Sequence, residues 1–124
     1  MVEEMKKFLT SLLHKVEGLY CIAITDRDGV PMVKVTNDKM PEMAVRPSFL
    51  STFAMATDQG SKLGLGLNKS VICMYSSYQV VQFPYLPFIV SFVASTKCNT
   101  GHILALDRSL QELLTDLKRT VIEP

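Results

Sequence analysis

The sequence predicts a single α+β domain: a five-stranded antiparallel sheet with two terminal helices on one face and a central helix on the other. Five short runs rich in β-branched and aromatic residues follow one another, mostly as hairpins. Three amphipathic helical stretches need a sheet against which to bury their apolar faces. The predicted order is α-ββ-α-βββ-α, and residues 1–124 form one domain.

The first half begins with a helix and a hairpin. Met1–Val16 carries apolar residues at three- and four-residue spacing, and the glycine that follows is a usual helix stop. Leu19–Thr25 has no charge and predicts a central strand that is apolar on both faces. Asp26–Gly29 predicts a tight turn, and Val30–Val35 predicts the second strand, where Pro31 indicates a sheet edge.

Three β-rich runs follow the central helix. Ser70–Tyr75 and Tyr78–Phe83 predict a second hairpin, which Pro84–Pro87 interrupts. Phe88–Ser95 is apolar enough to predict another central strand. Because Ser70–Tyr75 comes directly after the central helix, we expect it to be an exposed edge that can pair with another chain.

The last helix begins after a capping residue, Asn99 or Thr100. Its apolar positions keep a near-perfect 3.6-residue period. These positions are Ile103, Leu106, Leu110, Leu113, Leu114, Leu117 and Val121. The sequence therefore predicts one continuous terminal helix with a single apolar stripe.

The central helix, which we predict from Ser48 to about Lys62, has two faces that lack charge. Leu50, Phe53, Ala54 and Thr57 share one face at helical spacing, and Phe49, Phe53, Ala56 and Gly60 share a second. One face can cover the chain's own sheet, so the other needs a partner. The predicted interface comprises Phe49, Leu50, Phe53, Ala54, Ala56, Thr57, Gly60, Ser61, Val71, Cys73 and Tyr75.

The composition favours a protein-binding module. The chain is 48% hydrophobic and 20% charged with a net charge of +1, and its charges are scattered, so we expect no nucleic-acid partner and membrane residence only through other proteins. Cys21, Cys73 and Cys98 lie far apart and form no metal-binding pair. We interpret Cys21 and Cys73, which fall within strands, as buried apolar side chains. These features suggest a reducing compartment.

No motif predicts a catalytic residue, a cofactor or a metal site. Gly64–Ser70 resembles a phosphate-binding loop, but Asn68 replaces the required glycine and the segment runs from helix into strand. We interpret it as a plain connecting loop. Asp26 and Asp28 with Gly29 are similar to the start of a calcium-binding loop, but the other ligand residues and the closing glutamate are missing from the sequence that follows. His14 and His102 are isolated, so no nucleophile with an oriented base is indicated.

Several segments carry a resemblance over nearly the whole chain. They are VEGLYCIAITDRDGVPMVKV, RPSFLSTFAMATDQGSKLGL, KSVICMYSSYQVVQF and LPFIVSFVAS. The chain resembles the roadblock-fold scaffold proteins for mitogen-activated protein (MAP) kinases, which are subunits of the late-endosomal and lysosomal Ragulator complex. This resemblance implies a single roadblock domain, of the dynein-light-chain and profilin-like type, with no catalytic residue.

The resemblance also implies partners and a location. Such subunits pair obligately with a second roadblock subunit through the central helix and neighbouring strand, here Ser48–Lys62 and Ser70–Tyr75. A lipidated subunit wraps around the pair and holds it on the cytoplasmic face of late endosomes and lysosomes. The pair anchors Rag GTPases for amino-acid-dependent TORC signalling and brings a MAP kinase kinase to its MAP kinase.

Two other functions remain open from the residues alone. Some roadblock proteins act directly on the nucleotide state of a GTPase, although Arg46 and Arg108 are isolated and form no recognisable arginine-finger motif. The fold also permits a cargo linker similar to dynein light chains. A nucleotide-exchange assay and a partner pull-down would discriminate these from a scaffold.

Overall fold

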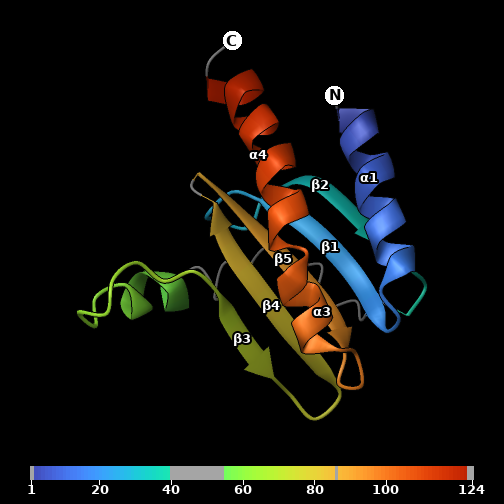
Figure 1. The fold of residues 1–124 in the computed structure, drawn as a ribbon, viewed down its shortest axis with the longest axis horizontal. Helices are drawn as coiled ribbons and strands as arrows, with labels where there is room; N and C mark the ends of the chain where they lie inside the picture. Colours follow the sequence, from blue (N-terminus) through green and yellow to red (C-terminus); the bar gives the residue numbers. More distant parts are fainter. Residues whose placement is uncertain (1, 40–54, 86, 123–124) are drawn as a thin grey trace.

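A single antiparallel sheet forms the centre of the molecule. The computed structural model describes residues 2–39, 55–85 and 87–122. Five strands lie in the order β2-β1-β5-β4-β3 (Figure 1). They are β1 (Leu19–Thr25), β2 (Pro31–Thr36), β3 (Val71–Met74), β4 (Tyr78–Tyr85) and β5 (Phe88–Ser95). The predictions of two edge strands and of central positions for β1 and β5 are confirmed.

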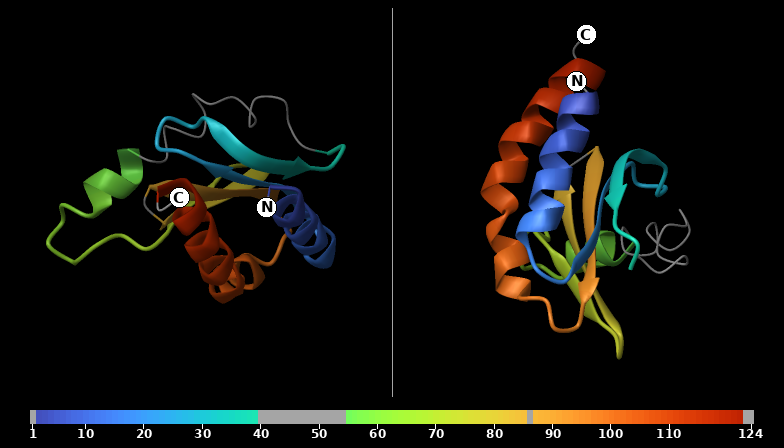
Figure 2. Two further views of the ribbon diagram at one scale, coloured as in Figure 1. Left: turned by 90° about the horizontal axis from the view of Figure 1, so that it is seen from above. Right: turned by 90° about the vertical axis from the view of Figure 1, so that its right-hand side faces the viewer.

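The terminal helices cover one face of this sheet. They are α1 (Val2–Lys15), α3 (Thr100–Ala105) and α4 (Asp107–Ile122). Figure 2 shows α1 and α4 on the same side of the strands, as predicted. The core between helices and sheet holds large, fully buried side chains. These include Met5, Leu9, Leu19, Ile22, Ile24, Phe92, Ile103 and Leu110.

A second, smaller cluster lies on the opposite face. Because side chains alternate along a strand, Ile22 and Ile24 of β1 face the helices, and Cys21 and Ala23 face the other way. Cys21 and Ala23 pack with Val80 and Val93, and the half-buried Cys73 of β3 lies against them. The sheet is therefore apolar on both faces, as the uncharged Leu19–Thr25 run predicted.

The described end of the central helix agrees with its predicted boundary. Residues 55–60 are helical, and turns follow at Ser61 and Lys62. The predicted start at Ser48 and the helix residues up to Ala54 lie outside the described residues. In Figure 1 the helical end and the loop after it project beyond β3.

The first hairpin has the predicted turn. Asp28 and Val30 donate backbone N–H groups to the Asp26 side chain at 2.9 and 3.0 Å, and Gly29 has a φ of +83°. The second strand runs from Pro31 to Thr36, one residue later than predicted. Pro31 begins an edge strand, where its missing N–H costs no ladder hydrogen bond.

The predicted interruption at Pro84–Pro87 is wrong for its first two residues. β4 continues through Pro84 and Tyr85, which pair with Ile89 and Phe88 of β5. The pairing of β3 with β4 begins only at Val71 and Gln82, so β4 has lost its second neighbour by Pro84. A proline is tolerated there because its nitrogen faces no acceptor strand.

The prediction of one continuous terminal helix is also wrong. Asn99 caps α3 by accepting the His102 N–H, and the helix ends at Ala105. The N–H of the C-cap residue Leu106 donates to Ile103 O at 3.1 Å. This three-residue spacing is a tighter turn than an α-helical one. The apolar period continues across the break because Leu106 is itself buried and Leu110 follows in α4. Hydrophobic periodicity alone therefore could not reveal that the helix is interrupted at the single residue Leu106.

Gly18 is a position where both the backbone and its surroundings require glycine. Its φ is +87°, and a Cβ there would lie 3.1 Å from Cys98 Cβ. We expect Gly18→Ala to lower the free energy of unfolding by about 1–3 kcal/mol, from backbone strain and this contact. Urea denaturation measures the loss.

Gly64→Ala is the matched control for this substitution. Gly64 also has a positive φ, +80°, but nothing lies within 4 Å of the added Cβ. The difference between the two variants therefore isolates the Cys98 contact. Equal losses would contradict the steric part of the prediction.

Candidate interaction surface

Strand β3 presents an open edge. Among the described strands it pairs only with β4, and the Tyr75 N–H donates to Tyr78 O at 2.8 Å. Antiparallel strands alternate between residues whose backbone faces the neighbour and residues whose backbone faces away. The backbone N–H and C=O groups of Cys73 therefore face β4. The backbone groups of Ile72 and Met74 point away from β4, toward the open edge. An edge of this kind can add a strand from another protein.

Exposed apolar side chains are concentrated in β3 and in the segment that leads into it. Most of the large exposed apolar residues in the described part of the chain fall between positions 55 and 75. We call them the open-edge surface: Met55, Leu63, Leu65, Leu67, Ile72, Met74 and Tyr75. Single exposed apolar residues are ordinary on proteins, but a group in one segment marks an interaction site.

The predicted interface residues lie partly on this surface. Phe49, Leu50, Phe53 and Ala54 are outside the described residues. Ala56 and Tyr75 are exposed, and Thr57, Gly60, Ser61, Val71 and Cys73 are half-buried. The interpretation of Cys73 as a buried side chain is thus only half right, because an edge strand has no neighbour to cover its outer side.

Gly60 and Ser61 have contacts within their own chain. A Cβ at Gly60 would lie 3.3 Å from Asn68 Nδ2, and Ser61 Oγ accepts the Asn68 N–H at 3.0 Å. Their small size, which we attributed to the approach of a partner helix, also fits the return of the following loop. Their place in an interface stays a prediction.

Sequence reasoning missed the most exposed part of this surface. Leu63, Leu65 and Leu67 are 71%, 87% and 85% exposed. Leu65 and Leu67 lie in Gly64–Ser70, which we interpret from the sequence as a plain connecting loop, and Leu63 directly precedes it. The alternation of leucine with glycine over 63–67 was the available signal.

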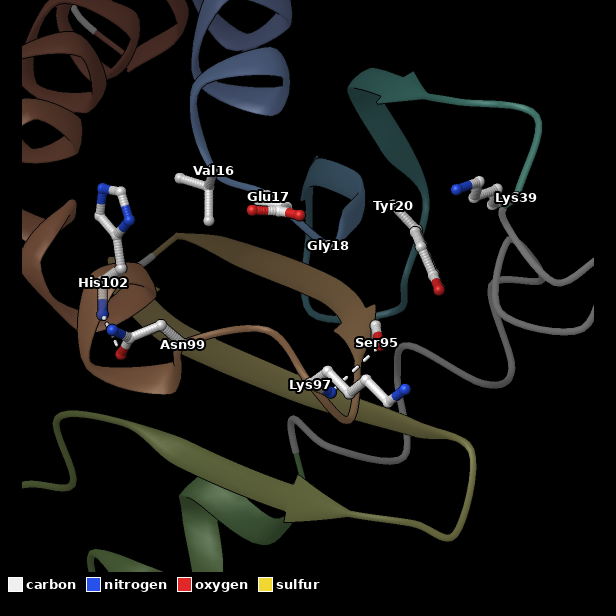
Figure 3. A pocket seen from close by; sticks show the side chains of 9 residues that line it. All are labelled: Val16, Glu17, Gly18, Tyr20, Lys39, Ser95, Lys97, Asn99 and His102. Atoms are coloured by element: carbon white, nitrogen blue, oxygen red, sulfur yellow. Dashed lines mark hydrogen bonds between the residues drawn. The ribbon is translucent and has the colours of Figure 1, made fainter.

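A cavity of about 540 Å³ lies at another end of the sheet (Figure 3). Its walls come from the turn between α1 and β1, the segment after β2, and the loop between β5 and α3. They include Glu17, Tyr20, Lys39, Lys97 and His102. The backbone N–H of His102 donates to Asn99 Oδ1. Figure 3 shows the His102 side chain on the opposite side of the cavity from both lysines. This lining supplies no nucleophile with an oriented base.

Burial disfavours the thiolate form of two cysteines, Cys21 and Cys98. Burial raises the pKa of the Cys21 thiol to about 12, against the weaker opposite effect of Lys34. Burial also raises the pKa of Cys98. Since the thiolate is the nucleophile, these shifts disfavour a nucleophilic role for both side chains. Within residues 2–39, 55–85 and 87–122, no three His, Cys, Asp or Glu residues come together as metal ligands.

The helices that the structure describes are too short or too polar to span a bilayer.

Comparison with known proteins identifies the family. The mitogen-activated protein kinase kinase 1 interacting family matches residues 3–121. The chain belongs to this family. Family membership confirms the predicted resemblance and the prediction of a non-catalytic protein, since the family is named for an interaction and not for a reaction.

Individual relatives match over their whole length. Ragulator complex protein LAMTOR3-A of Xenopus laevis is 59% identical over 122 residues, which cover 98% of this chain and 99% of the relative. Ragulator complex protein LAMTOR3 of Homo sapiens is 57% identical over 121 residues, with 98% of each chain covered. This member of the family is therefore similar to Ragulator proteins from end to end.

The fold agrees with a solved roadblock structure. The Roadblock/LC7 domain from Streptomyces avermitilis superposes with a TM-score of 0.67, covering 86% of this chain and 93% of that domain. The sequence identity is 16%, so this likeness concerns the fold alone. It confirms the predicted roadblock fold.

Proposed function

We propose that this protein is a non-catalytic scaffold subunit of a Ragulator complex. The observation that carries the proposal is the 57–59% identity to Ragulator proteins across nearly the full length of both chains. A scaffold acts by effective concentration: two proteins bound to one surface meet as if at roughly millimolar concentration. No reactive side chain is needed for that role.

The first partner in this proposal is a second roadblock subunit. It would pair with the central helix, Ser48–Lys62, and with the outer edge of β3. The proposal is supported by the outward backbone groups of Ile72 and Met74 and by the exposed apolar side chains around them. Pairing would satisfy the backbone groups and remove the apolar surface from water.

The remaining partners follow from the same family relationship. A lipidated subunit would wrap around the roadblock pair and hold it on the cytoplasmic face of late endosomes and lysosomes, with a further pool in the cytosol. The pair would anchor Rag GTPases for amino-acid-dependent TORC signalling. It would also bind a MAP kinase kinase together with its MAP kinase. The family is named for its interaction with such a kinase kinase.

Co-expression with the roadblock partner tests the proposal. We expect one stable species containing one copy of each subunit in native mass spectrometry, and capture of purified kinase kinase by that species. A chain that stays a stable monomer beside the partner would overturn the proposal. Acceleration of nucleotide exchange by the purified pair alone would instead favour direct regulation of a GTPase.

A further inference from the structure

The loop between the central helix and β3 displays three leucines to solvent. Leu63, Leu65 and Leu67 are each more than two-thirds exposed. Gly64 and Gly66 between them have φ values of +80° and +94°, and no atom of the described residues lies within 4 Å of a Cβ built on either. We call residues 63–67 the leucine loop. Three leucines exposed within five residues concentrate apolar surface in one short segment, and concentrated exposed apolar surface is a mark of interaction sites.

The base of the leucine loop is closed by hydrogen bonds. Ser61 Oγ donates to Thr57 O at 3.1 Å and accepts the Asn68 N–H at 3.0 Å. The loop therefore leaves the helix and returns beside it before β3 begins. A closed base restricts the loop before binding, so less conformational entropy is lost when the leucines are buried.

We propose that the leucine loop is a third contact element, which inserts Leu63, Leu65 and Leu67 into an apolar pocket on the second roadblock subunit. The inference rests on the proposed function, because it assumes that the helix and the β3 edge face that subunit. The loop connects these two elements directly. A partner that covers both must then lie beside the loop.

The size of a stable interface supports this assignment. Such interfaces use about 20–30 residues from each side. Strand β3 has four residues, and a helix contributes only one face. The leucine loop supplies the additional apolar area. Lys62 and Lys69 are exposed on either side of it, so we expect carboxylates at the rim of the partner's pocket.

A membrane is the other surface that could bury leucines beside lysines. Binding to anionic lipids typically uses clusters of four to eight basic residues. Only Lys62 and Lys69 flank the loop directly, and the net charge of the chain is +1. The continuity of the loop with the β3 edge favours a protein partner.

Replacing all three leucines by serine tests the inference. We expect the Leu63→Ser, Leu65→Ser, Leu67→Ser chain to bind the roadblock partner at least about 30-fold more weakly in calorimetry, with an unchanged melting temperature of the isolated chain. The single substitution Leu65→Lys should weaken binding in the same direction. The control is Val30→Ser with Leu104→Ser, which removes exposed apolar side chains elsewhere and should leave affinity unchanged.

Hydrogen exchange gives an independent measurement. Amides of residues 62–68 should become protected when the partner is added, and this protection should be lost in the triple variant. The inference would be overturned if the triple variant bound the partner with the affinity of the wild-type chain and its amides at residues 62–68 were protected to the same extent. If the edge substitutions described below still abolish pairing, that result would leave the proposed function standing.

Two further results would overturn the inference in different ways. Flotation of the wild-type chain with phosphatidylcholine and phosphatidylserine vesicles, lost in the triple variant while pairing is unchanged, would assign the loop to a membrane. Complete failure of the wild-type chain to pair would overturn the proposed function, and the loop assignment with it.

Discussion

A chain carrying Ile72→Pro and Met74→Pro is expected to lose pairing with the second roadblock subunit and to keep its own fold. Both residues lie on β3 with their backbone N–H groups directed away from β4. Proline removes these two donors without removing a hydrogen bond between β3 and β4. Edge strands tolerate proline for the same reason.

The expected loss is large because the partner's acceptors are left buried. Each unsatisfied backbone carbonyl costs about 1–3 kcal/mol, which corresponds to a roughly tenfold to hundredfold loss of affinity. Two such losses should abolish co-elution in gel filtration at micromolar concentration. Circular dichroism of the isolated variant checks that the fold is retained.

The opposite edge of the sheet offers a matched control. Asn37 N–H donates to Tyr20 O, so the alternation along β2 directs the Lys34 N–H outward. Lys34→Pro therefore removes an outward donor from the other edge strand. We expect the Lys34→Pro chain to pair with the second roadblock subunit as the wild-type chain does. Equal losses of pairing in both variants would show that proline acts through stability and not through the β3 edge.

Gln79→Met is expected to lower the free energy of unfolding by about 2–4 kcal/mol. The Gln79 side chain is 1% exposed, and its Nε2 donates to Ser95 O at 2.9 Å and to Cys98 O at 3.0 Å. Its Oε1 accepts from Thr100 Oγ1 at 2.5 Å. These bonds join β4 to the β5–α3 loop. Methionine keeps the length of the side chain but leaves the partner groups unsatisfied.

Urea denaturation measures this loss, and Gln111→Met is the control. Gln111 is exposed on α4, where its Nε2 donates to Asp107 Oδ2 at 3.2 Å. Water replaces that bond readily, so we expect a change within about 0.5 kcal/mol. If Gln79→Met were equally mild, the network around Gln79 would contribute little to stability.

The elements that sequence predicted well are those with a strong local signal. The uncharged Leu19–Thr25 run, the turn at Asp26–Gly29 and the proline at the start of β2 each depend on residues close in the chain. The same holds for the end of the central helix near Gly60. Local sterics and hydrophobic periodicity suffice for these features.

The elements that sequence predicted wrongly depend on distant neighbours. Pro84 stays in β4 because β3 has already ended beside it, and that fact concerns residues on another strand. The sequence correctly predicts a connecting loop at Gly64–Ser70, but no motif predicts that its leucines are exposed. Its exposure becomes visible only when the neighbouring elements are in place.

The amino-acid sequence by itself determined the order of the strands along the chain, the family relationship and the expectation that a second protein is required. The tertiary structure decided which backbone groups of β3 face outward, which leucines remain in water and that the Gln79 amide is buried. The physical reason is that periodicity records the face on which a residue lies. Exposure and hydrogen bonding depend on what other parts of the chain cover that face.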